Sequence, residues 1–82
     1  MSDRQTYRTF ILDNFLFTDD QDALKDDESF LQKGIIDSTG IMEVILFVEE
    51  QLEITVEESE MVPENFDSID ALLAYSKKRK AG

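Results

Sequence analysis

The sequence contains neither cysteine nor histidine, and each absence excludes a class of chemistry. Without cysteine there can be no disulfide framework and no thiolate metal site. Without histidine the chain lacks the commonest general base and metal ligand, together with the second member of most nucleophilic triads. We therefore expect no metal site of these kinds, and we predict that the chain is not an enzyme.

Long apolar runs and positive charge are also scarce. No window approaches the roughly 18 consecutive apolar residues of a membrane span, and residues 1–8 are too polar for a signal peptide. We therefore expect a cytoplasmic protein that does not enter a membrane. The net charge is −11, and no Lys or Arg stands between positions 34 and 76. Such a surface repels nucleic acid and attracts a basic patch on another protein, although acidity that serves solubility alone explains the charge equally well.

What is present is the composition of a small folded domain. The 82 residues are 41% hydrophobic and 33% charged, a balance typical of globular proteins. A chain of this length buries only about 60% of the surface that its unfolded form exposes, so a deep catalytic cleft is not expected. We predict one domain over residues 1–82, and a monomer is the default.

Apolar periodicity predicts an all-α bundle with three principal helices and a short one. The principal helices are expected over residues 4–17, 38–52 and about 68–80. A short helix or turn is expected over residues 63–66, where Pro63 suits the first helical position. A long first loop, residues 18–36, lacks a sustained period.

Particular side chains are expected to hold these elements in place. Ser38 and Asp67 are of residue types that favour helix N-caps, so they are expected to open the second and the last helix. Phe17 is expected to widen the apolar face of the first helix. The expected core residues of the loop and of the last helix are Phe30, Leu31, Ile35 and Ile36, and Ile69, Leu72 and Leu73.

Two charged segments suggest binding functions that their spacing does not support. A calcium-binding loop that starts at Asp20 would have Leu24 at its fifth position and Lys25 where the obligatory glycine belongs. The acidic loop is therefore expected to be solvated. The basic residues 77–80 suit the negative end of a helix dipole, and so few cations on so acidic a chain do not favour a nucleic-acid site.

The second helix has two faces. At about 100° per residue, one stripe consists of apolar residues and is explained by packing against a core. The other, here called the outward face, mixes apolar and acidic residues, which suggests a docking surface. Alternatively, its Met and Leu pack under the long loop. The core stripe consists of Ile41, Val44, Ile45, Val48 and Leu52, and the outward face of Thr39, Met42, Glu43, Leu46, Glu49 and Glu50.

Two motifs flank this helix. Residues 34–40 read Gly-Ile-Ile-Asp-Ser-Thr-Gly, and residues 61–69 read Met-Val-Pro-Glu-Asn-Phe-Asp-Ser-Ile. Over roughly residues 31–75 the chain resembles acyl carrier proteins, in which an Asp-Ser pair starts the second helix at the site of phosphopantetheine attachment. One departure concerns partner choice, because many carriers have Leu after the serine where this chain has Thr39 and Gly40.

The resemblance implies an acyl-carrier-like fold that forms one carrier domain and bears a covalent 4'-phosphopantetheine arm on Ser38. A serine hydroxyl without a base is a weak nucleophile, so a separate phosphopantetheinyl transferase would have to supply base and metal. The resemblance also implies that Asp37 helps the transferase to recognise the site, although a plain turn residue is the alternative. The implied contacts with partner enzymes are Met42, Glu43, Leu46, Glu49 and Glu50.

The resemblance also implies what the arm would carry. Its thiol would hold acyl cargo as a thioester and pass it from an acyl- or aminoacyl-activating ligase to downstream enzymes of fatty-acid-like or specialised biosynthesis. Two alternatives stay open. One is an aminoacyl or peptidyl carrier, because the ligase chooses the cargo. The other is an unmodified acidic helical adaptor, which would use the same outward face and leave Ser38 as a plain helix cap.

Overall fold

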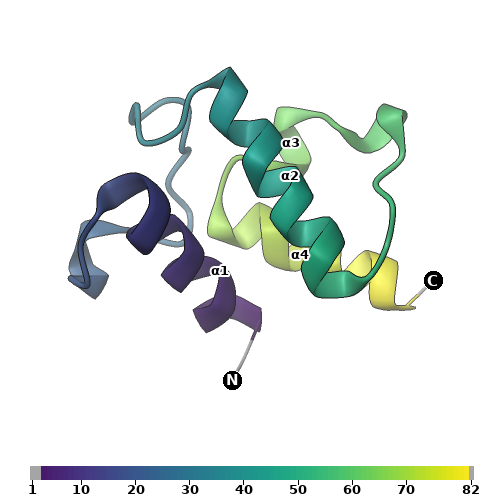
Figure 1. The fold of residues 1–82 in the computed structure, drawn as a ribbon, viewed down its shortest axis with the longest axis horizontal. Coiled ribbons are helices and arrows are strands. Elements are labelled where there is room, and N and C mark those ends of the chain that lie inside the picture. The colour runs from purple at the N-terminus through teal and green to yellow at the C-terminus, as the bar shows by residue number, and fades with distance from the viewer. Residues whose placement is uncertain (1–2, 82) are drawn as a thin grey trace.

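The computed structural model describes residues 3–81, which form an all-α bundle (Figure 1). The prediction of three principal helices and a short one is confirmed. No helix in this range is long and apolar enough to cross a membrane. The helices are α1 (Asp3–Ile11), α2 (Ser38–Leu52), α3 (Pro63–Phe66) and α4 (Ile69–Ala81), and the short turns between them are η1 (Leu12–Leu16), η2 (Gln21–Ala23) and η3 (Glu58–Glu60).

The first predicted helix has nearly the expected extent, but its last turn widens into the π-helix η1. The turn ends at Phe17, which has a left-handed backbone conformation and donates its N–H to the carbonyl of Leu12. Phe17 is 81% exposed, so the prediction that it widens the apolar face was wrong. The widened turn rotates the following residues away from the face that a regular period would give them.

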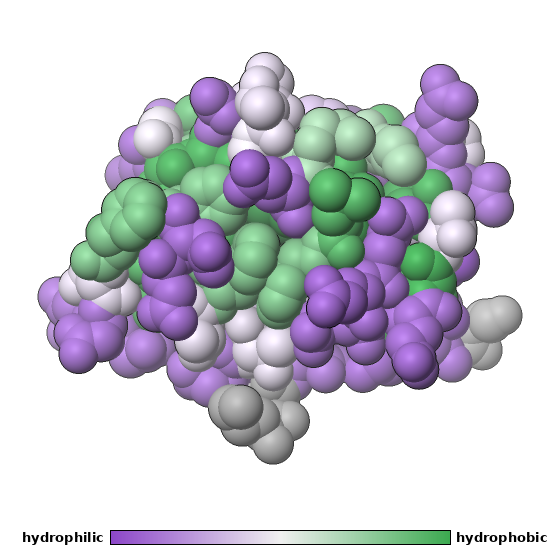
Figure 2. All heavy atoms as spheres, viewed as in Figure 1, coloured by the Kyte–Doolittle hydropathy of each residue, from purple (hydrophilic) through white to green (hydrophobic). Residues whose placement is uncertain are grey.

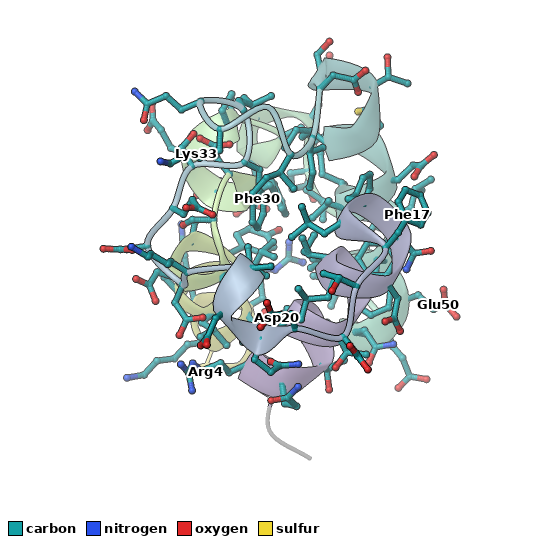
Figure 3. The ribbon with its side chains drawn as sticks, turned by 90° about the vertical axis from the view of Figure 1, so that its left-hand side faces the viewer. Arg4, Phe17, Asp20, Phe30, Lys33 and Glu50 are labelled. Atoms are coloured by element: carbon teal, nitrogen blue, oxygen red, sulfur yellow. The ribbon has the colours of Figure 1, made fainter. Side chains whose placement is uncertain are left out.

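The long loop over residues 18–36 is confirmed, and the 3₁₀-helix η2 is its one helical element. Phe30 and Ile36 are buried as predicted, and Ile35 packs partly against the core. Figure 3 shows Phe30 pointing inward from the loop. The prediction for Leu31 was wrong, because that side chain is exposed, whereas Leu24 is buried and was not predicted.

Asp67 fastens this loop and does not cap α4, which corrects the prediction. Its carboxylate accepts a hydrogen bond from the Ser29 hydroxyl and another, 2.9 Å long, from the N–H of Leu31. The helix cap is the next residue, Ser68, whose hydroxyl accepts the N–H of Ala71 at 3.0 Å. Both residue types are good caps, so their order in the sequence did not decide between them.

A second attachment joins the loop to α1 through Asp26. The nearly buried Arg8 donates to the Asp26 carboxylate at 2.6 Å and to the carbonyl of Gln21 at 2.5 Å, and Arg4 pairs with the same carboxylate. Burial alone would raise the pKa of the Asp26 carboxyl, but the hydrogen bonds and charges of Arg8 and Arg4 together outweigh it and hold the pKa below its usual value. The ionised form of Asp26 is therefore part of the native structure.

The segment between α2 and α3 is held against α4 by a smaller network. The hydroxyl of Tyr75 donates to the Glu60 carboxylate at 3.0 Å, and Arg79 donates to the same carboxylate at 2.9 Å. Arg79, in the basic tail, thus contributes a specific tertiary contact besides its favourable place at the end of the helix dipole. In α4, Ile69 and Leu72 are buried as predicted, Leu73 is half-buried, and Tyr75 and Ser76 are further buried residues.

Candidate functional site

Ser38 is the first residue of α2, and Asp37 caps the helix in its place. The Asp37 carboxylate accepts the N–H of Gly40 at 2.7 Å, and the Asp37 carbonyl accepts the N–H of Ile41 at 3.0 Å. The expectation that Ser38 is the cap was wrong. Because Asp37 has this role, the Ser38 side chain is not required to hold the helix end together.

The Ser38 hydroxyl is exposed and has no hydrogen-bond partner within residues 3–81. Three other serines differ from it: Ser29 donates to Asp67, Ser68 caps α4, and Ser76 is buried against Tyr7 with 2.5 Å between the two hydroxyl oxygens. Ser59 is also exposed, but it lies in the short turn η3. Among the serines whose structure is described, Ser38 alone combines an exposed hydroxyl with the start of a long helix.

Close packing explains why the chain has glycine at position 40, one of the two residues after Ser38 that differ from many carriers. A Cβ atom at this position would stand 2.5 Å from Cγ2 of Ile36 and 3.1 Å from Cε1 of Phe15. The first distance is far below ordinary van der Waals contact, and Ile36 is buried. Only glycine therefore lets the first turn of α2 lie this close to the loop and to η1.

The two faces of α2 are arranged as the sequence predicted. Four of the five core-stripe residues are buried and Leu52 is half-buried. On the outward face, Met42 is 49% and Leu46 61% exposed, so the alternative that they pack under the long loop is wrong. Glu43 and Glu50 are exposed as well. Figure 2 shows hydrophobic and hydrophilic side chains interspersed over the side of the molecule on which α2 lies.

Glu49 differs from the other residues of the outward face because it is half-buried. Its carboxylate accepts the N–H of Val56 at 2.8 Å, and its carbonyl accepts the N–H of Ile54 at 3.1 Å. Glu49 thus fixes the chain where it turns back after α2. The periodicity placed this residue correctly on the helix but could not show that its side chain reaches a backbone group beyond the helix end.

The surroundings of Ser38 are compatible with a phosphate ester. The ester would extend from an exposed helix end, and no cavity would have to open to admit it. The Gly40 N–H is already bonded to Asp37, which leaves the N–H groups of Ser38 and Thr39 at the positive end of the helix dipole without a partner in the described range. Asp37 is the nearest titratable residue along the chain, and its carboxylate is engaged as the cap. The site therefore offers an exposed hydroxyl at the helix end, beside a carboxylate that already serves as the cap.

Two cavities on the surface lie away from Ser38. One, of about 710 Å³, is lined by α1 and the loop, including Arg8 and Asp26, whose side chains already bond to each other. The other, of about 530 Å³, lies between Asp3 and the C-terminal half of α4. Ser38 is not among the residues that line either cavity.

Comparisons with known proteins leave the site to be interpreted from its own residues, because no family model matches the chain and no curated protein matches it. The resemblance around Ser38 therefore stays a prediction.

Proposed function

We propose that this chain is an acyl carrier protein in which Ser38 receives a 4'-phosphopantetheine arm. The observation that carries the proposal is the exposed hydroxyl of Ser38 on the first turn of α2, which has no hydrogen-bond partner among residues 3–81 and lies on the same helix as exposed apolar and acidic residues. Asp37 supports it, because this residue holds the helix end while leaving the hydroxyl available.

In the modification, Ser38 acts as a substrate. Its oxygen forms a bond to phosphorus in the pyrophosphate of coenzyme A, and the pyrophosphate bond breaks to release adenosine 3',5'-bisphosphate. The hydroxyl proton passes to a base of the transferase. Once attached, the arm supplies a thiol that holds the cargo as a thioester.

The outward face supports repeated, short-lived docking. Met42 and Leu46 offer apolar contact, while Glu43 and Glu50 offer charge that accelerates encounter with a basic surface. After docking, an arm attached to Ser38 would keep its cargo at a high effective concentration near the partner's active site. Ligases that load the arm and enzymes that use its cargo are the partners that this arrangement suits.

The proposal is tested by incubating purified protein with a broad-specificity phosphopantetheinyl transferase, coenzyme A and Mg²⁺, and then measuring the intact mass. We expect wild-type protein and the matched control Ser59→Ala to gain one phosphopantetheine, and Ser38→Ala to gain none. If the wild-type mass stays unchanged while a known carrier is modified in the same tube, the chain is an unmodified acidic adaptor and the proposal fails.

A further inference from the structure

Phe17 combines two unfavourable features. The residue is 81% exposed, the largest fraction among the large hydrophobic residues that the structure describes. Its backbone has φ 53°, a left-handed conformation that glycine or asparagine adopts at much lower cost. A bulky apolar residue at such a position weakens solubility and backbone stability together, and its ring gains little burial in return.

The backbone around Phe17 is nevertheless well fixed. The N–H groups of Phe17 and Thr18 both donate to the carbonyl of Leu12, the second at 3.1 Å. The hydroxyl of Thr18 accepts the N–H of Asp20 at 3.1 Å, which holds the next turn. The ring is therefore presented from a defined position, as a contact residue needs to be to bind without a large loss of entropy.

Phe17 is also connected to the start of α2. Phe15, two residues earlier in the chain, has its ring against Gly40, two residues after Ser38. Figure 3 shows the Phe17 side chain at the edge of the molecule. A protein that binds over Ser38 and the first turn of α2 would therefore lie beside the segment that carries Phe17.

The charges around Phe17 indicate what kind of protein would bind it. Asp13, Asp19 and Asp20 are all exposed and lie within four residues of Phe17. An apolar side chain among carboxylates repeats the composition of the outward face. Its complement is an apolar recess bordered by Lys or Arg, and the same complement would suit Met42 and Leu46 with their neighbouring glutamates.

We propose that Phe17 is a contact residue for the phosphopantetheinyl transferase and inserts its ring into such a recess when the enzyme acts on Ser38. This inference rests on the proposed function and adds to it a second contact, at the residue that directly follows η1. Aromatic side chains that become buried at an interface often dominate its affinity. Burial of the ring in the complex would then offset the unfavourable free energy of its exposure and of its left-handed backbone in the free protein.

The test is steady-state modification kinetics with the same transferase. Phe17→Ala should raise the KM for this chain roughly 5- to 30-fold, the usual range when an aromatic interface residue is truncated, with kcat unchanged. Phe17→Gly should raise KM as much, yet its melting temperature should equal or exceed that of the wild type because glycine relieves the left-handed backbone. Phe17→Leu should retain part of the affinity. The control Val62→Ala removes an exposed apolar side chain from the segment before α3 and should leave KM unchanged.

The outcomes separate this inference from the proposed function. If the wild type is modified on Ser38 and both Phe17→Ala and Phe17→Gly keep the wild-type KM, the contact is absent although the carrier function stands. If KM rises only in variants that also melt at a lower temperature, Phe17 is structural and the inference fails. If Ser38 is never modified, the proposed function itself fails.

Discussion

Phe15 lies against the backbone of Gly40, with its Cε1 atom 3.1 Å from the point where a Cβ atom at Gly40 would stand. Ile36 approaches the same point to 2.5 Å. Through these two contacts, η1 and the end of the long loop hold the first turn of α2, on which Ser38 stands. The position of the candidate modification site thus depends on a residue that has no side chain.

Replacing Gly40 with alanine should therefore destabilise the protein. Overpacking of this kind costs about 1–3 kcal/mol, which exceeds the gain of at most about 1 kcal/mol in helix propensity. Chemical denaturation of Gly40→Ala would measure the loss. Thr39→Ala, at the exposed neighbouring position, is the control and should change stability little. An alanine variant as stable as the wild type would show that Ile36 moves aside freely.

The helix cap can be separated from the modification site. Asp37→Ala should lower the free energy of unfolding by about 0.5–2 kcal/mol, because the Gly40 N–H loses its acceptor, whereas Asp37→Asn should retain most of the stability. Ser38→Ala should stay within about 0.5 kcal/mol of the wild type. Thermal or urea melts of the three variants and the wild type would measure these differences in stability. A large loss in Ser38→Ala would contradict the assignment of the cap to Asp37.

The outward face should influence partner encounter and not the fold. Glu43→Lys combined with Glu50→Lys should lower kcat/KM for modification of Ser38 by roughly tenfold at low salt and by less at high salt, since summed surface charge governs encounter. Glu49 is left out of this variant because its carboxylate bonds to the N–H of Val56. Instead, Glu49→Ala should lower the melting temperature. Charge reversal that unfolds the protein, or has no effect at any salt concentration, would contradict this assignment.

The core stripe, the short helix and the long loop could be predicted because each leaves a local signal in the sequence: a helical period, Pro63 at a first helical position, and an acidic stretch without a period. Three other features of the structure could not be predicted from the sequence. Asp67 and Ser68 are both good caps, and only the distant Ser29 and Leu31 determine which one caps α4. The π-turn that exposes Phe17 has no residue signature of its own. Glu49 lies where the period puts it, but its hydrogen bond depends on the path of the chain after α2.

Acid should weaken the attachment of the loop to α1. The pKa of Asp26 is lower in the folded protein than in the unfolded chain, so the stability that it contributes is present above about pH 4 to 5 and is lost as the pH falls through the folded pKa. Asp26→Asn should lower the free energy of unfolding by about 1.5–3 kcal/mol at pH 7 and flatten its dependence on pH below about 5. Urea melts of the wild type and of Asp26→Asn, repeated from pH 7 downward, would measure both effects. The control is the exposed neighbour Asp27→Asn, and an equally flat profile in that variant would contradict the role of Asp26.

The central claim is that Ser38 bears the arm, and peptide mapping of the modified protein tests it most directly. Cleavage after Glu28 and Glu43 releases peptide 29–43, which contains only two serines, Ser29 and Ser38. The Ser29 hydroxyl donates to Asp67, whereas Ser38 is exposed at the start of α2, so fragmentation should place one phosphopantetheine on Ser38 and none on Ser29. An unmodified peptide 29–43 in protein that has gained the mass, or a modification that persists in Ser38→Ala, would contradict the account.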